Sequence, residues 1–376
     1  FFFNFYLIYR GLSKGIEKFC LFAMPLLVFL AILIVFRVLT LGTPDPSNPS
    51  QNLVNGLGYM WNPDWAQLRN PEVWLAACGQ IFFSLSVGFG IVMTYSSYLR
   101  KKDDVVLSSL TASATNEFCE VCLGGLMVIP AAFVFLGMSQ MESVAGANAF
   151  SLGFVTMPHI FAEMPAGQVF QGMFYFLLFL AGVTSSLSML QPAIAFFEEG
   201  FNMNRRTSVT ILAMLTFLGA NAVILTDEFF VLTTLDTYAG NLGIPLLALS
   251  ELILFIFVIK VATGVKEGSY GANMKLPFWF GFVVTFISPV FLILILGSWA
   301  ITKFLPLIID TAFGEWIYGY VSFLFEGRPE WVPLESLEKY TLFGMLVFFF
   351  FLGLLVKLSW QNMVQRYQTY MLSDEG

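Results

Sequence analysis

The chain has 376 residues, of which 57% are hydrophobic and 11% are charged, and its mean hydropathy is +0.78. These values exclude a soluble globular protein and indicate a polytopic membrane protein. The net charge of −7 comes mostly from acidic residues in loops, and the sequence carries no basic patch of the kind that binds nucleic acid.

Apolar stretches long enough to cross a membrane core of about 30 Å occur eight times. They lie near residues 19–41, 74–99, 105–137, 168–197, 208–226, 241–262, 277–301 and 341–363. Thirteen of the 18 Lys and Arg residues fall on one side of these stretches, and five fall on the other. Because cytoplasmic loops are enriched in Lys and Arg, we expect the side with thirteen, and the C-terminus with it, to face the cytoplasm.

The first nine residues, FFFNFYLIY, are apolar but too few to span a membrane before Arg10. We therefore expect the chain to begin within a helix. A short cytoplasmic link follows, and residues 19–41 then lead outward. Residues 43–73 are rich in Pro, Asn, Gly and Asp, a composition that predicts an ordered extracellular loop.

The stretch from Ala76 to Arg100 is long enough to be one membrane helix. Two hydroxyl-bearing residues and two glycines interrupt it halfway, namely Ser84, Ser86, Gly88 and Gly90. Each unsatisfied backbone group at that depth costs several kcal/mol, so an opened helix persists only where protein, an ion or a polar ligand meets those groups. We predict a broken helix at a binding site over Phe83–Phe89. The alternative is a continuous helix whose small residues pack against its neighbours.

The span after it carries polar residues where lipid would exclude them. Ser113, Asn116, Glu117 and Glu120 are spaced i, i+3, i+4 and i+7, which puts them on one face of an α-helix. Two carboxylates inside a membrane are costly unless they are paired, protonated or hydrated, and they indicate a functional site. A seam of hydrogen bonds that only joins helices is the alternative.

Residues 138–167 contain neither Lys nor Arg but several Gly and Pro, and we expect an extracellular loop that dips back as a lid. Its lone histidine, His159, is expected to be a surface residue. The next span has a second polar face with the same spacing, formed by Ala181, Thr184, Ser185 and Ser188. Such residues serve either helix packing or oxygen ligation of a hard cation.

Three segments carry a resemblance to a known family. They are GQIFFSLSVGFG, TYSSYLRKKDDVVLSSLTASATNEFCEVCLGG and LAGVTSSLSMLQPAIAFFEE. They resemble the neurotransmitter:sodium symporter family, and within it the bacterial amino-acid transporters typified by the leucine transporter. The similarity runs from about Tyr9 to about Lys303. It implies an all-α membrane protein with two inverted five-helix repeats and two extra C-terminal helices.

The resemblance also implies how the chain is divided. Residues 1–41 would be the end of the fourth helix and the fifth helix of the first repeat, so that the first three helices are missing. Residues 42–73 would be the extracellular loop, 74–262 the whole second repeat, and 263–376 the two C-terminal helices with a long extracellular loop and a cytoplasmic tail. Aromatic residues in 302–340 indicate a segment in the membrane interface, to which we assign no function.

Ion ligands follow from the same resemblance. Ser84 and Asn116 match side-chain ligands of a first sodium site. The Ala181 carbonyl and the Thr184 and Ser185 hydroxyls match a second. Glu120 stands where chloride-dependent members carry Ser, so its carboxylate would replace the anion.

The substrate site and its gates are implied in the same way. The residues expected around the substrate are Phe83, Ser84, Ser86, Phe89, Ser185 and Met189. The residues expected at the outer gate are Gln80 and Asp236, and those at the inner gate are Tyr98 and Glu199. A pocket with two Phe and a Met favours an apolar side chain.

We therefore expect a multi-pass transporter of the plasma (inner) membrane that couples sodium to the uptake of hydrophobic amino acids by alternating access, without chloride. An osmolyte or amine carrier is the alternative, and a non-transporting receptor is a further one. An enzyme is not expected, because the clustered His, Cys or Asp that it would need at the membrane face are missing from the sequence. The expected partners are sodium, an amino acid as the small-molecule substrate, and the lipid bilayer, and homo-oligomerisation stays open.

Overall fold

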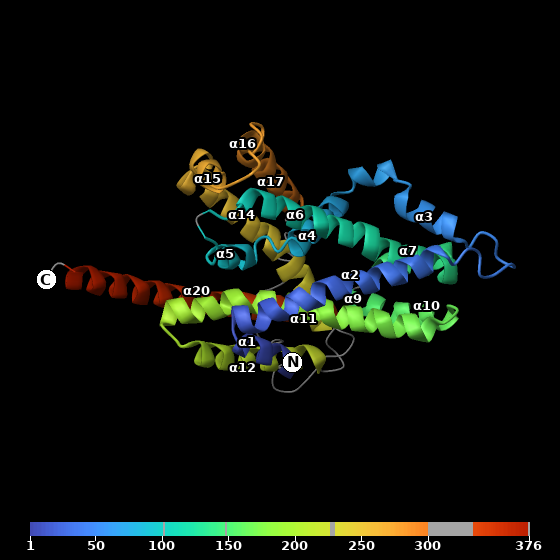
Figure 1. Cartoon of the computed structure of the whole chain (residues 1–376), viewed down its shortest axis with the longest axis horizontal. Helices are drawn as coiled ribbons and strands as arrows, with labels where there is room; N and C mark the ends of the chain where they lie inside the picture. The colour runs from blue at the N-terminus through green and yellow to red at the C-terminus, as the bar shows by residue number, and fades with distance from the viewer. Residues whose placement is uncertain (101, 147–148, 226–229, 300–333, 375–376) are drawn as a thin grey trace. The chain divides into compact units, whose positions relative to one another are not determined.

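The computed structural model describes all residues except 101, 147–148, 226–229, 300–333 and 375–376 (Figure 1). Every regular element among the described residues is helical. The chain forms two compact units, the first made of Phe1–Gln67 and Leu107–Ser188 and the second of Leu68–Val106 and Met189–Gly376. Helices α6 and α11 each begin in one unit and end in the other.

The first unit is built around α2 and α7. Its elements, in chain order, are α1 (Phe2–Tyr9), η1 (Leu12–Glu17), α2 (Lys18–Leu39), α3 (Leu53–Trp61), η2 (Trp65–Arg69, its last residues in the other unit), α6 (Val105–Glu117), η3 (Phe118–Gly125), α7 (Leu126–Leu136), α8 (Met138–Gly146), α9 (Ala149–Ser151), η4 (Leu152–Thr156), α10 (Met157–Glu163) and the first half of α11 (Gly167–Phe201). α2 and α3 both pack against α7, as Figure 1 shows for the blue and green helices. Buried apolar residues such as Ile34, Ala131 and Met127 form the core there.

The described part of the expected lid, 138–167, forms the short helical elements α8, α9, η4 and α10, and its role as a lid stays a prediction. Met157, Ile160, Phe161 and Met164 recur at i, i+3, i+4 and i+7, and all four are buried in the core of the first unit. This apolar period explains why the segment is helical. His159, on α10, is exposed, as expected for a surface residue.

The second unit contains the broken helix. Its elements are α4 (Pro71–Ser84), α5 (Ile91–Ser96), the second half of α11, α12 (Arg205–Ile224), α13 (Phe230–Leu235), η6 (Asp236–Gly243), α14 (Ile244–Leu254), η7 (Phe255–Ile259), α15 (Val261–Gly268), α16 (Phe280–Phe282), η8 (Val283–Ile287), α17 (Ser288–Trp299) and α20 (Leu334–Asp374). α4 packs on α17 through Leu75, Cys78 and Ile295, and the rings of Trp74 and Phe291 meet edge to face, 5.8 Å between centroids. α4 also contacts α14.

Six helices among the described residues are long and apolar enough to cross a membrane, so the chain is an all-α, multi-pass membrane protein. They begin at Lys14, Val105, Gly167, Val231, Phe280 and Gly344 and match six of the eight predicted spans. The predicted span at 74–99 is the broken one, and that at 208–226 is helix α12. Most of the expected interface segment, 302–333, lies outside the described residues, and its end is already part of α20.

Candidate functional site

The predicted break in the second unit is present. α4 ends at Ser84 and α5 begins at Ile91, so the helix is open over residues 85–90, one or two positions later than predicted. Ser86, Gly88 and Gly90 have φ angles of 58°, 80° and 70°, all in the left-handed region. Glycine adopts this region without strain, whereas Ser86 does so at a cost of about 1–2 kcal/mol. A strained residue at an opened membrane helix is typical of a binding site.

The opened backbone is met by a carboxylate. The Gly88 N–H lies close to the carboxyl group of Glu251 on α14. A Cβ on residue 88 would lie 2.8 Å from the carbonyl oxygen of Ile244, so only glycine lets the two segments approach this closely. The sequence analysis missed Glu251, although it is the one acidic residue within the apolar run 241–262.

Aromatic side chains flank the break. The rings of Phe83 and Phe89 lie edge to face, with 5.8 Å between centroids and 68° between planes. Phe83 is 47% exposed, and the Ser84 hydroxyl donates to the carbonyl of Ile81 at 3.4 Å. The two Phe residues that were predicted to contact substrate are therefore together, and one of them presents half of its surface outward. The same unit carries Met189, which is 41% exposed on α11.

The first unit contains the hydroxyl-rich turn of α11. The Thr184 hydroxyl lies 3.0 Å from the carbonyl oxygen of Ala181 and 3.0 Å from that of Leu180, and it donates to both. Ser188 in turn donates to the Thr184 carbonyl at 3.2 Å. Two of the three predicted ligands of the second sodium site, Ala181 and Thr184, thus have their oxygens side by side. Hydroxyl and carbonyl oxygens of this kind are ligands for hard cations. The third predicted ligand, Ser185, is an exposed residue of the same turn.

The acidic face differs from its prediction in one respect. α6 is an α-helix only as far as Glu117, and η3, which contains Glu120, is a π-helix. The i, i+3, i+4, i+7 rule assumes an α-helix, so it holds for Ser113, Asn116 and Glu117 but not for Glu120. Single-turn π segments occur often at functional sites, and this one holds a carboxylate within a membrane span.

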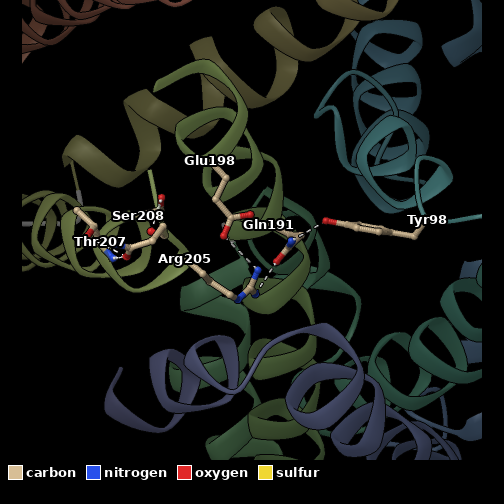
Figure 2. A network of polar contacts seen from close by, with 7 residues as sticks. Tyr98, Gln191, Glu198, Arg205, Thr207 and Ser208 are labelled. Carbon is tan, nitrogen blue, oxygen red and sulfur yellow. Dashed lines mark hydrogen bonds and ion pairs between the residues drawn. The ribbon is translucent and has the colours of Figure 1, made fainter. Parts of the chain in front are cut away.

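A polar network lies at the end of α11 in the second unit (Figure 2). Gln191, which is fully buried, donates through Nε2 to the Tyr98 hydroxyl at 3.3 Å and accepts at Oε1 from Arg205 at 3.3 Å. The Arg205 guanidinium also lies 3.6 Å from a carboxylate oxygen of Glu198. Figure 2 shows the Arg205 side chain reaching from the start of α12 toward α11, with Glu198 and Gln191 on either side of its guanidinium.

The position of Arg205 follows from the start of α12. Asn204 caps this helix, because its side-chain oxygen accepts from the Thr207 N–H at 2.9 Å and from the Thr207 hydroxyl at 3.0 Å. Arg205 is the first residue of the helix, where the helix dipole disfavours a positive charge. The carboxylate of Glu198 and the amide oxygen of Gln191 offset that cost.

The predicted gate residues fall only partly within this network. Tyr98 belongs to it, but its acid is Glu198 rather than the predicted Glu199, whose side chain is exposed. Glu199 contributes its backbone carbonyl instead, which accepts a hydrogen bond from Arg366 on α20 at 2.6 Å. Of the outer-gate residues, Gln80 is exposed on α4 and Asp236 is exposed at the start of η6. The gate roles of all four residues stay predictions.

The sequence analysis missed Gln191, Glu198 and Arg205. A glutamine directly before Pro192, deep in an apolar run, was the available signal for a buried polar contact.

Residues 1–329 match the model of the Sodium:neurotransmitter symporter family. The chain belongs to this family. It is a family of transporters, not of enzymes, and the family resemblance seen in the sequence is therefore confirmed.

Several relatives of the chain are named as sodium-dependent transporters. The chain is 30% identical to an uncharacterized sodium-dependent transporter of Methanocaldococcus jannaschii, over 75% of this chain and 56% of the relative. A relative of the same description in Haemophilus influenzae is 28% identical over 78% and 63%. The sodium-dependent nutrient amino acid transporter 1 of Drosophila virilis is 24% identical over 77% and 45%.

A solved structure has a similar fold. The chain superposes on MhsT, crystallised in complex with L-phenylalanine, with a TM-score of 0.66 and 25% identity over 79% of this chain and 66% of MhsT. The predicted fold class is confirmed by this likeness and by the helical elements. The chain spans 45–63% of the length of the three relatives above.

Proposed function

We propose that this chain belongs to a sodium-coupled symporter for hydrophobic amino acids that works by alternating access. The observation that carries the proposal is the opened segment 85–90 with its three left-handed residues, next to which lies the carboxyl group of Glu251. Opened backbone inside a membrane protein requires polar partners, and in secondary transporters such discontinuous helices form the binding site for substrate and coupling ion.

The apolar character of the substrate is argued from the residues around the break. Phe83 and Phe89 offer aromatic surface, and Met189 is an unbranched side chain that adapts to different shapes. The substrate's carboxylate would meet the first sodium ion and the opened backbone. Names of relatives support this class, since one is a nutrient amino acid transporter and MhsT was crystallised with L-phenylalanine.

The ion sites are proposed in two parts. Ala181, Thr184 and Ser185 would hold the second sodium ion, supported by the adjacent oxygens of Ala181 and Thr184. Ser84 and Asn116 would hold the first, a proposal that rests on the family pattern. The intramembrane carboxylate of Glu120 would replace chloride and make transport chloride-independent. We place the complete protein in the plasma (inner) membrane with the C-terminus in the cytoplasm, because of the Lys and Arg bias.

The test is uptake of labelled phenylalanine by the complete protein in proteoliposomes, with an inward gradient of sodium or of potassium. Uptake should require sodium and should be blocked by excess apolar amino acids but not by betaine or by amines. Inhibition by betaine or an amine alone would establish the osmolyte or amine carrier instead. Uptake that is equal in both gradients would refute sodium coupling.

A matched pair of variants tests the second sodium site. Thr184→Val removes a hydroxyl that bonds the carbonyl four residues earlier, and Thr216→Val on α12 removes a hydroxyl with the same local bond, 2.7 Å to the Leu212 carbonyl. A contact to a charged group contributes about 1.5–3 kcal/mol, so Thr184→Val should weaken apparent sodium affinity by about 10-fold or more. Thr216→Val should leave it unchanged. Equal sodium curves for both variants would remove Thr184 from the site.

A further inference from the structure

Asn4 is a polar residue in an otherwise apolar helix. It lies in α1, is 8% exposed, and donates through Nδ2 to the Ser186 hydroxyl on α11 at 2.5 Å. Both residues belong to the first unit, and Figure 1 shows α1 beside α11. This is a side-chain hydrogen bond between residues 182 positions apart in the sequence.

The contact is a poor way to join two helices. The Asn4 Oδ1 atom is buried and has no hydrogen-bond partner within the described part of the chain. A buried polar atom in that condition costs about 1–3 kcal/mol, which exceeds the net gain of a typical single hydrogen bond, about 1 kcal/mol. A leucine of similar shape would bury apolar surface without that cost, so stability alone does not explain an asparagine here.

Ser186 lies in the turn that carries the proposed sodium ligands. It follows Thr184 and Ser185 directly, and the Thr184 hydroxyl is held at 3.0 Å from the Ala181 carbonyl oxygen within the same turn. Ligand oxygens work as a site only when they are held within about 0.5 Å of the productive geometry. Hydroxyl groups that bond carbonyls of their own helix, as those of Thr184 and Ser188 do, favour bending of the helix. A hydrogen bond from another helix to Ser186 opposes this bending and limits rotation of the turn.

We propose that Asn4 is a positioning residue for the second sodium site. This inference rests on the proposed function, since the second sodium site is itself part of that proposal. Asn4 does not touch the ion. It fixes Ser186, and through Ser186 the orientation of the Thr184 and Ser185 hydroxyls, in the way that outer-shell hydrogen bonds orient the ligands of other metal sites.

The test compares Asn4→Leu, Ser186→Ala and Thr184→Val in the complete protein, with Asn221→Leu as control. Asn221 donates from Nδ2 to the Phe217 carbonyl of its own helix at 2.7 Å. Two quantities are measured for each variant: the sodium concentration that gives half-maximal phenylalanine uptake, and the melting temperature of the purified protein without sodium.

Asn4→Leu should raise the half-maximal sodium concentration by about 10-fold, the lower end of the effect of outer-shell changes on metal affinity, with uptake at saturating sodium retained. Its melting temperature without sodium should equal or exceed that of the parent. Ser186→Ala should shift the sodium curve similarly, and the double variant should shift it no further, because both changes remove one interaction. Asn221→Leu should leave the sodium curve where it is.

A purely structural role makes the opposite prediction. If Asn4→Leu lowered the melting temperature and left the sodium curve in place while Thr184→Val shifted it, the positioning role would be wrong and the proposed function would stand. If Asn4→Leu did not fold, an unshifted curve in Ser186→Ala would overturn the role equally. A normal sodium response of Thr184→Val would remove the site itself, and the role of Asn4 with it.

Discussion

Replacing Arg205 by Ala should destabilise the C-terminal end of α11, while the same change at Arg206 should not. Arg205 donates to the fully buried Gln191 at 3.3 Å and lies 3.6 Å from Glu198, whereas Arg206 is an exposed neighbour on the same helix. Loss of the donor leaves a buried amide oxygen short of a partner, which costs about 1–3 kcal/mol. Loss of the partly exposed ion pair adds at most about 1 kcal/mol.

The expected total for Arg205→Ala is therefore about 1–4 kcal/mol, against about 0.5 kcal/mol or less for Arg206→Ala. The assay is thermal unfolding of the purified complete protein in detergent, followed by reaction of a thiol dye with cysteines such as the buried Cys78. Gln191→Leu should lower the melting temperature by a similar amount, and adding Arg205→Ala to it should have little further effect, because both changes break one network. Equal melting temperatures for the two arginine variants would refute the importance of the network.

Three further predictions concern the proposed site. Gly88→Ala should abolish uptake, because the new Cβ would lie 2.8 Å from the Ile244 carbonyl oxygen and residue 88 has a φ of 80°. The control Gly172→Ala, with no atom within 4 Å of the new Cβ, should raise stability by about 0.5–1 kcal/mol. Normal uptake by Gly88→Ala would contradict the need for a close approach between residue 88 and Ile244. Met189→Ala should shift competition for uptake toward larger side chains such as Trp, and an unchanged ranking would remove Met189 from the pocket. Glu120→Ser should lose uptake in chloride-free buffer and regain it as chloride is added, with the parent indifferent to chloride; no rescue by any halide would mean that Glu120 only joins helices.

Local sequence features were sufficient for the broken helix. Two glycines and two serines at mid-depth of one apolar stretch disagree with a continuous membrane helix, and the chain does open there. The same reasoning did not reveal the helices within 138–167, where Met157, Ile160, Phe161 and Met164 recur with an α-helical period and are buried. It also failed at Glu120, because nothing in the local sequence distinguishes a π-helix from an α-helix.

Contacts between distant residues could not be predicted from the sequence. Glu251 lies on α14 and Gly88 lies in the opened segment between α4 and α5. A lone acid in an apolar run indicated that it has some polar partner, but the sequence did not show which one. Gln191, Arg205 and Glu198 were missed for the same reason, and the acid next to the predicted Glu199 makes the ion pair. Periodicity specifies the face on which a residue lies, while the pairing of faces depends on how the helices pack.

Helix α11 shows why this pairing matters for function. It is one continuous helix from Gly167 to Phe201, and it carries both the Thr184 turn and Gln191, the buried residue that Arg205 contacts. Seven residues separate Thr184 from Gln191, which is two turns and about 10 Å along the axis, so the two side chains lie on the same face. A helix is stiff over two turns, and a shift of its C-terminal end after loss of the Arg205 contacts would therefore move the Thr184 oxygens as well. Two measurements distinguish this indirect effect, transmitted along α11, from direct loss of an ion ligand. Arg205→Ala should lower the melting temperature and weaken sodium dependence only as far as α11 moves. Thr184→Val should change the sodium curve alone.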